Sequence, residues 1–490
     1  MQTKCYNEVL GEKELMKERT TITFHSGLDS IGGVVMEVRY GNDRAFFEAG
    51  TAYNPAFDMF DGSVDLRKNF IQDYLWIDEI PFIDGIYRKQ DIEKRYPNLI
   101  SAQDYPIDDQ AFFITHLHLD HMRMMGMIDP SVRVYLSKPA QIIEKALEDV
   151  DQGVQSIRGF DYTDMEDEMD VGKIHIKRFI LNDDSYQDYS FYIETPDLKM
   201  HHTGDVFLYG KYEANILKEI EYLNEKKIDL LFCEGTRFFA EMKPEDFKDR
   251  KLIPSFKPKD GMITFDRLKE RMIETVNSHK GLIIFNYYER EMSDVLLFTE
   301  ISEKTGRKLV YEPESAHIIN EFFHRPVCVA VPDTYLKEPD YLKDILSCNE
   351  VITKEEILDH PDRYMVQNTY PNILELFDYR NADTLYMHHS GIPLGDFDPK
   401  YSNLLNVINS CRMAYDKTYI GEDGYFSPHG ETWQILAYIE MVNARLTVPC
   451  HSGNRKAFEA NLRVPYFHAE RKVCYIYDRE ENILKEADHE

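Results

Sequence analysis

A short segment of the chain gathers four side chains that could bind metal ions. The apolar residues Ala111–Ile114 run directly into the sequence His116-x-His118-x-Asp120-His121. Imidazole and carboxylate groups are ligands of zinc and similar divalent metals. The spacing places His116 and His118 on one side of an extended turn and leaves Asp120 and His121 to serve a second metal. Two metals about 3.5–4 Å apart can hold water between them and make it a nucleophile at neutral pH.

Three more candidate residues follow further along the chain. Asp205 ends a His-Thr-Gly-Asp sequence directly after a predicted strand, Lys199–His202. His451 directly follows the predicted strand Leu446–Cys450, and His429 precedes the helix that leads into that strand. These residues favour a metal site over a polar loop in which the histidines stand by chance.

The elements expected to position these residues follow from hydrophobic patterning. Short apolar or alternating runs bounded by turn residues predict strands, and one-faced apolar spacing predicts helices. The other predicted strands of this part are Thr21–Phe24, Val34–Tyr40, Arg44–Glu48, Val132–Leu136, Gly172–Leu181, Ser190–Glu194 and Asp229–Cys233. The predicted helices are Val64–Tyr74, Pro139–Asp149 and Glu213–Lys227. The densely acidic run Asp161–Asp170 is predicted to be a solvated loop.

The character of the sequence changes near residue 240, where helix and strand signals begin to alternate. The predicted helices are Phe265–Ser278, Glu291–Lys304 and one that Pro399 opens and that runs through Ser410. The predicted strands are Leu282–Asn286, Lys308–Tyr311 and Thr384–His388. This rhythm is typical of a small α/β domain with parallel strands.

The His116–His121 segment resembles the signature of the metallo-β-lactamase fold superfamily. The later motifs resemble its β-CASP branch, which includes ribonuclease J and the mRNA 3′-end cleavage nuclease. The resemblance implies an α/β protein: a four-layer αββα metallo-β-lactamase sandwich with an inserted β-CASP-like α/β cap domain. The expected division is a lead-in over 1–20, a metallo-β-lactamase domain over 21–238 and 413–490, and the inserted domain over 239–412.

The resemblance also assigns roles. His116 and His118 would hold one metal, Asp120, His121 and His451 the other, and Asp205 would bridge both. Asp120 and His429 would be the catalytic residues. Glu48 and Glu234, each at the end of a predicted strand, would support the metal ligands through hydrogen bonds.

One position departs from the family pattern. Asp183 stands where the family has a further metal-binding histidine. If Asp183 binds the first metal, the site is richer in oxygen ligands, and manganese or iron competes better with zinc. Alternatively, the first metal is weakened or absent. His201 and His202 are poorer substitutes, because neighbours in a strand point to opposite faces of a sheet, and we expect both to be structural.

Two positions are candidates for the histidine that acts on the leaving group. His429 fits the family's spacing to a following helix and strand, but its local sequence is Ser-Pro-His where Ser-Gly-His is usual. His388 and His389 precede a Ser-Gly pair that begins at Ser390 and are the alternative. These three residues would otherwise bind a phosphate of the substrate at the cleft between the domains.

The implied function is that of a ribonuclease J-like nuclease, which cleaves phosphodiester bonds of single-stranded RNA or DNA with a metal-bridging hydroxide. It would use two divalent metal ions, zinc foremost. The net charge of −30, from 57 basic and 87 acidic residues, argues against broad binding of nucleic acid. A hydrolase of a small phosphodiester, ester or lactone is therefore the second hypothesis. The third is a metal-depleted, non-catalytic binding protein, which only the change at Asp183 supports.

Composition bounds the remaining expectations. The 490 residues suffice for two or three domains. Seven scattered cysteines without a CxxC pair indicate reduced thiols. There is neither a signal-peptide pattern at the start nor an apolar run long enough to cross a membrane, so we expect a cytoplasmic protein with no membrane partner. The family resemblance implies a homodimer.

Overall fold

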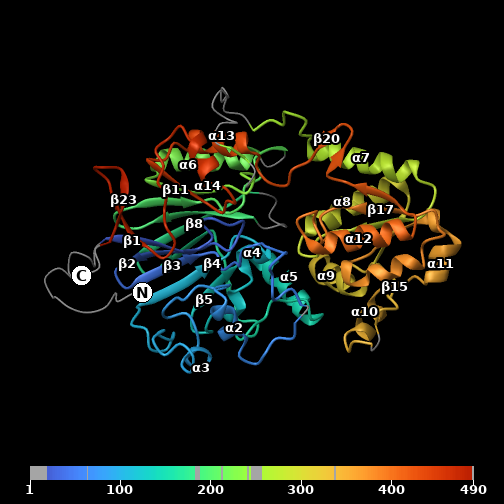
Figure 1. Cartoon of the computed structure of the whole chain (residues 1–490), viewed down its shortest axis with the longest axis horizontal. Helices are drawn as coiled ribbons and strands as arrows, with labels where there is room; N and C mark the ends of the chain where they lie inside the picture. The colour runs from blue at the N-terminus through green and yellow to red at the C-terminus, as the bar shows by residue number, and fades with distance from the viewer. Residues whose placement is uncertain are drawn as a thin grey trace.

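The computed structural model describes residues 19–62, 64–181, 188–210, 213–239, 242–243, 256–335 and 338–487. The described strands form three large sheets and one small two-stranded sheet (Figure 1). The chain is therefore an α/β protein with several sheets, as the sequence predicts. The lead-in expected over 1–20 lies almost entirely outside the described residues.

The first sheet has eight strands in the order β23-β22-β1-β2-β3-β4-β5-β6. It joins the beginning and the end of the described chain, because β1 pairs antiparallel with both β2 and β22. The strands are β1 (Thr20–Ser26), β2 (Val35–Tyr40), β3 (Asp43–Phe47), β4 (Asp109–Phe113), β5 (Arg133–Leu136), β6 (Thr163–Asp164), β22 (Cys474–Asp478) and β23 (Ile483–Glu486).

The second sheet has six strands in the order β21-β11-β10-β9-β8-β7. They are β7 (Glu168–Val171), β8 (Ile174–Ile180), β9 (Tyr189–Glu194), β10 (Lys199–His202), β11 (Leu230–Glu234) and β21 (Leu446–Cys450). The two sheets share one apolar core. Across it, the Phe47 and Phe191 ring centroids lie 5.7 Å apart, and those of Phe24 and Phe232 lie 5.6 Å apart.

Helices cover the outer faces of both sheets, with α6, α13 and α14 on one side and α2, α4 and α5 on the other (Figure 1). Local signals set their ends: Ser137 accepts a hydrogen bond from the Ala140 N–H at the start of α5, and Glu431 and Gln434 form a capping box at the start of α13. The helices are α2 (Phe70–Trp76), α3 (Lys89–Ile92), α4 (Leu119–Met122), η1 (Met125–Met127), α5 (Lys138–Asp149), α6 (Glu213–Lys226), α13 (Thr432–Val442) and α14 (Arg455–Asn461).

The third sheet lies to one side of the other two and has seven parallel strands in the order β15-β14-β13-β16-β12-β17-β18 (Figure 1). Its central strands β16, β12 and β17 are buried throughout, because helices cover both of its faces. The strands are β12 (Ile283–Asn286), β13 (Lys308–Tyr311), β14 (Cys328–Val329), β15 (Glu350–Val351), β16 (Tyr364–Gln367), β17 (Leu385–His388) and β18 (Ala414–Lys417).

The helices of this third-sheet unit are α7 (Phe265–Ser278), α8 (Met292–Thr305), α9 (Pro313–Phe323), α10 (Leu342–Cys348), α11 (Lys354–Asp359), η4 (Pro361–Arg363), η5 (Tyr370–Phe377) and α12 (Pro399–Ser410). The parallel α/β arrangement predicted for this part is confirmed. The sheet continues past the predicted boundary at 412, since β18 pairs with β17. The short strands β19 (Ile420–Gly421) and β20 (Gly424–Tyr425) follow as the two-stranded sheet.

Two local predictions are wrong. The helix predicted over Val64–Tyr74 begins only at Phe70. The acidic run Asp161–Asp170 contains β6 and the start of β7 rather than a loop. Its acidic side chains alternate with Met169 and Val171, which are buried, so the exposed face of a strand carries the charge. Among the described residues, no helix is both long and apolar enough to cross a membrane.

Candidate metal centre

The predicted ligands meet where strands of the first two sheets end. After β4 the chain is extended through His116 and turns into α4, for which His118 is the N-cap residue. Asp205 follows β10, and His451 follows β21. Two groups of ligand atoms result, each within 4.8 Å of one another: those of His116, His118 and Asp205, and those of Asp120, His121 and His451.

Asp205 lies between the two groups. Its Oδ1 is 3.3 Å from His121 Nε2 and 3.6 Å from His451 Nε2. Its Oδ2 is 3.8 Å from His116 Nε2 and 3.5 Å from Nδ1 of His429. One carboxylate oxygen therefore faces each group, as the bridging role expected for Asp205 requires.

Two buried atoms at this point have no hydrogen-bond partner, His116 Nε2 and Asp205 Oδ1. Buried polar atoms in proteins are normally paired, so such atoms need a physical reason. Both belong to the ligand groups, and imidazole nitrogen and carboxylate oxygen are the donors that divalent metals take. The residues present therefore fit two divalent ions.

In three of the histidines, the ring nitrogen that faces away from Asp205 is hydrogen-bonded to a neighbouring side chain. His116 Nδ1 hydrogen-bonds the Thr115 hydroxyl at 2.9 Å, and His451 Nδ1 hydrogen-bonds the Thr236 hydroxyl at 2.9 Å. His121 Nδ1 hydrogen-bonds Glu48 Oε1 at 3.2 Å. Such bonds fix the ring orientation and the tautomer of a metal-binding histidine.

The two carboxylates expected to support the ligands do so in different ways. Glu48 is fully buried, contacts His121 directly and also accepts hydrogen bonds from the Thr115 N–H and hydroxyl. The Glu234 oxygens accept hydrogen bonds from the N–H groups of Val206, at 3.1 Å, and Thr236, at 2.8 Å. Glu234 therefore acts through Thr236. Burial, with Asp205 nearby, raises the pKa of Glu234 to about 7.

Two loops hold the histidine segment in place: the β1–β2 loop, through Gly33, and the loop after β3, through Ala49. The Gly33 N–H donates to the Asp120 carbonyl at 2.7 Å, and the Ala49 N–H donates to the His121 carbonyl at 2.8 Å. A Cβ atom on Gly50 would lie 1.7 Å from the Asp120 carbonyl oxygen. Only a residue without a side chain fits there, so the approach of the two segments requires glycine.

The shifted pKa values at the centre determine which groups are neutral and which are charged. Burial and the neighbouring His121 and His118 lower the pKa of His116 well below its ordinary value. Burial raises the pKa of Asp205, but His121 and His451 outweigh burial and bring it well below the ordinary value. At neutral pH His116 is thus neutral and Asp205 ionised, which is the form in which both bind metals.

His429 reaches the same centre through the loop before α13, where the Gly430 N–H donates to the Val206 carbonyl at 2.7 Å. Burial lowers the pKa of His429 to about 4, although Asp205 works against the shift. A quarter of its side chain is exposed, 24%, so the ring can meet a ligand beside Asp205.

The rival residues of the third-sheet unit are occupied by protein partners. His388 bonds the Tyr415 hydroxyl at 2.8 Å and the Gly391 carbonyl at 3.0 Å. His389 bonds the Thr418 hydroxyl at 2.6 Å and Asp294 at 3.2 Å, and the Ser390 hydroxyl donates to the same Asp294. Their polar atoms are engaged with protein groups and a carboxylate lies among them, which does not favour an anion; phosphate binding by His388, His389 and Ser390 stays a prediction.

The two histidines of β10 point to opposite faces of the sheet, as expected for neighbours in a strand. His201 Nε2 lies 2.9 Å from Glu219 and 3.0 Å from the Tyr438 hydroxyl on the helix-covered face. His202 stacks on Phe47 in the core between the sheets, with ring centroids 6.0 Å apart.

Asp183 lies outside the described residues. Two other carboxylates, which the sequence analysis missed, lie near His118. Glu291, directly before α8, places its Oε1 2.9 Å from His118 Nε2. Burial, with Glu291 nearby, raises the pKa of Asp188 well above the usual value, and His118 and Asp205 are among its electrostatic neighbours. No spacing rule relates either carboxylate to His118, so only the fold reveals them.

Aromatic side chains line the third-sheet side of the centre. The Tyr288 ring centroid is 5.5 Å from that of His118, and Phe397 packs edge-on to Tyr53 at 6.1 Å. The Tyr53 hydroxyl is buried without a hydrogen-bond partner. Burial, with Asp398 and Asp120 nearby, raises its pKa. Aromatic rings and carboxylates thus lie together near this side of the centre.

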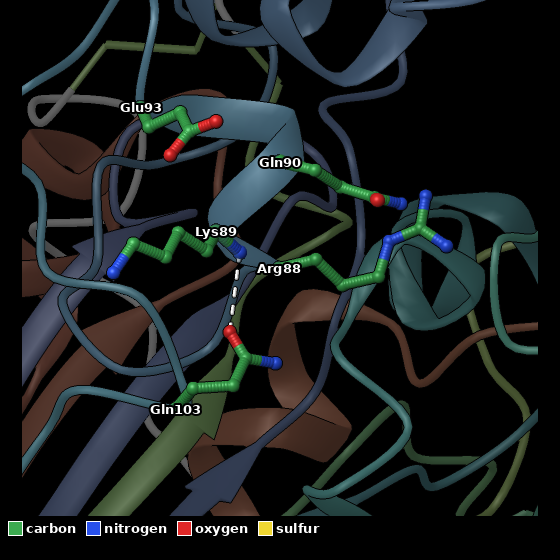
Figure 2. A pocket seen from close by; sticks show the side chains of 5 residues that line it. All are labelled: Arg88, Lys89, Gln90, Glu93 and Gln103. Carbon is green, nitrogen blue, oxygen red and sulfur yellow. Dashed lines mark hydrogen bonds between the residues drawn. The ribbon is translucent and has the colours of Figure 1, made fainter.

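A separate surface hollow of about 340 Å³ lies at α3, lined by Arg88, Lys89, Gln90, Glu93 and Gln103 (Figure 2). Arg88 pairs with Asp91 at 2.6 Å, and Lys89 pairs with Asp104 at 3.1 Å. Its basic groups are therefore neutralised, and the hollow shares no residue with the metal centre.

Comparison with known proteins gives a fold relationship alone. No family model and no curated protein matches this chain. A crystal structure of a protein of unknown function from Enterococcus faecalis V583 matches with a TM-score of 0.70 and 24% sequence identity. The match covers 94% of this chain and 100% of that chain. The two proteins thus share their whole architecture.

Proposed function

We propose that the chain is a two-metal hydrolase of the metallo-β-lactamase superfamily, with the third-sheet unit as a β-CASP-like cap. The observation that carries the proposal is the pair of ligand groups on either side of Asp205, in which His116 Nε2 and Asp205 Oδ1 are buried without partners. Two stacked sheets covered by helices, with the site at their strand ends, also support it.

The reaction we propose is hydrolysis of a phosphodiester, as in ribonuclease J. When bound, two divalent ions, zinc or alternatively manganese or iron, would supply Lewis acidity and an activated water. His116, His118 and Asp205 would hold one ion and Asp120, His121, His451 and Asp205 the other. His429 would interact with the leaving-group oxygen of the phosphodiester. Because its pKa of about 4 leaves it neutral at pH 7, it would donate a hydrogen bond rather than act as a charged acid.

A small phosphodiester, ester or lactone is the second candidate substrate. Among the described residues near His118 are two carboxylates, Glu291 and Asp188, and the aromatic ring of Tyr288. A polyanion such as single-stranded RNA gains affinity from basic side chains, and the net charge is −30. The lining and the charge therefore favour a compact substrate, whereas the family resemblance favours RNA or DNA.

The first test is metal content by mass spectrometry, followed by assays with 5′-phosphorylated single-stranded RNA and with bis-(p-nitrophenyl) phosphate. Two ions per chain and shortening of the RNA are expected for a nuclease. Two ions with turnover of the small ester alone would select the second candidate. A chain that binds no divalent metal would contradict both and favour a non-catalytic binding protein. Light scattering of the same sample tests the proposed homodimer.

We expect His118→Ala to abolish metal-dependent hydrolysis while leaving the fold intact, because the variant loses one ligand of the first group. Circular dichroism and thermal melting check the fold. His175→Ala is the matched control, since His175 is a partly exposed histidine of β8 that pairs with Asp170. Retained metal-dependent turnover in His118→Ala contradicts the proposed site.

A further inference from the structure

One histidine of the centre is held from a different part of the molecule than the others. Thr115, Glu48 and Thr236, which bond His116, His121 and His451, all lie on segments of the first two sheets. His118 is bonded by Glu291, which belongs to the third-sheet unit, 173 residues away in the chain.

This bond uses a particular nitrogen. Glu291 Oε1 lies 2.9 Å from His118 Nε2, so Nε2 carries the proton that the carboxylate accepts. A protonated nitrogen cannot bind a metal, which leaves Nδ1 as the atom that His118 can offer. One nitrogen of His118 is within 4.8 Å of the ligand atoms of both His116 and Asp205.

We propose that Glu291 is a positioning residue of the metal centre, which holds His118 from the third-sheet unit in the tautomer that leaves Nδ1 able to bind a metal. The inference rests on the proposed metal centre and adds a residue to it. Carboxylate partners of this kind typically change metal affinity about 10–100-fold.

The Glu291 carboxylate is itself fixed. Its Oε2 accepts a hydrogen bond from the Ser293 hydroxyl at 3.1 Å. On the preceding residue, the buried Arg290 guanidinium bonds Glu144 of α5 and donates to the Gln152 carbonyl at 3.2 Å. The Tyr288 N–H donates to the Ser390 hydroxyl at 2.9 Å. The turn that carries Glu291 is thus bonded both to α5 and the segment after it and to the third-sheet unit. Its contact with His118 therefore depends on the position of the third-sheet unit relative to the first sheet.

The test compares Glu291→Gln and Glu291→Ala with the wild-type chain, titrating zinc against a chromophoric chelator. Glutamine keeps the size and a weaker acceptor, and alanine removes the acceptor. We expect one of two zinc ions to bind more weakly, with the larger loss in Glu291→Ala, while the second ion is unaffected. Glu303→Gln, an exposed glutamate on the same helix, is the matched control.

Histidine-selective ¹⁵N NMR of the zinc-loaded protein gives a second measurement. A zinc-bound Nδ1 and a protonated Nε2 at His118 are expected in the wild-type chain, and loss of that signature in Glu291→Ala. Native affinity for both ions in each Glu291 variant, or zinc on Nε2, overturns the role of Glu291 but leaves the metal centre standing. A wild-type chain that binds no zinc overturns both.

Discussion

At the scale of single residues, hydroxyl groups hold two of the candidate metal-binding histidines, His116 and His451. Thr236 connects two features: its N–H donates to Glu234, and its hydroxyl hydrogen-bonds His451 Nδ1. His451 itself has a φ of +48°, in the left-handed region, so its backbone is held in an unfavourable conformation. The hydrogen bond with the Thr236 hydroxyl group orients the imidazole ring so that Nε2 faces Asp120 and Asp205.

We expect Thr236→Val to weaken binding of the second metal by about 10–100-fold, because valine keeps the shape of threonine but cannot hydrogen-bond His451 Nδ1. Thr236→Ser retains the hydroxyl and is expected to bind as the wild type does. Zinc titration of the two variants checks this difference. Equal affinities in both would show that the hydroxyl does not orient His451.

Residue spacing predicted most of the centre. The His-x-His-x-Asp-His segment is local, so its pattern alone predicts ligands, and Asp205 and His451 each follow a strand that patterning finds. Glu291 and Asp188 could not be found in this way, because their approach to His118 follows from packing between distant segments. For His388 and His389 the local sequence fits the predicted site, and the fold pairs their nitrogens with Gly391 and Asp294, which no sequence pattern indicates.

At the scale of elements, the loop after β3 and the turn into α4 act as one unit. They are joined by backbone hydrogen bonds and by the close approach of Gly50 to Asp120. The turn carries three of the candidate ligands, so displacing it displaces them together.

We expect Gly50→Ala to destabilise the protein by about 1–3 kcal/mol or more and to weaken both metals, since the added methyl overlaps the Asp120 carbonyl. Denaturant unfolding and zinc titration measure the two effects. Gly453→Ala is the control, because its added Cβ meets nothing closer than 3.9 Å. A Gly50→Ala chain with native metal affinity would mean that the turn adapts without moving its ligands.

Elements with a regular apolar face were the most predictable. The helix α7 begins and ends at the predicted residues, whereas the 11-residue helix α9 was not predicted. β14 and β15 are two residues each and carry no periodicity, so patterning did not detect them. The acidic strands near residue 165 were missed because charge on the exposed face hid the alternation beneath it.

At the scale of the whole molecule, a buried ion pair fixes the third-sheet unit against the first sheet's helices. Arg290 pairs with Glu144 of α5, and both side chains are almost fully buried. A second pair, Lys400 with Asp61 at 2.7 Å, is more exposed. Breaking a buried pair leaves a charge without compensation, which is far more costly than losing an exposed one.

We expect Arg290→Met to lower the free energy of unfolding by about 3–5 kcal/mol, because Glu144 is left as an unpaired buried carboxylate. Adding Glu144→Gln removes that charge and keeps an acceptor for the Val154 N–H, so the double variant should recover most of the loss. Denaturant unfolding measures both. A double variant no more stable than Arg290→Met alone would show that the pair's charge is not what matters.

The position of β21, β22 and β23 has a consequence for biosynthesis. These strands are the last described segments to leave the ribosome, yet β22 pairs with β1, and β21 completes the second sheet and delivers His451. The third-sheet strands, by contrast, lie in one continuous stretch and can fold as they emerge. A nascent or prematurely terminated chain that lacks these strands therefore exposes the open edge of β1, a template for aggregation, and lacks one candidate metal ligand. The full set of candidate ligands is present only after β21 has been synthesised.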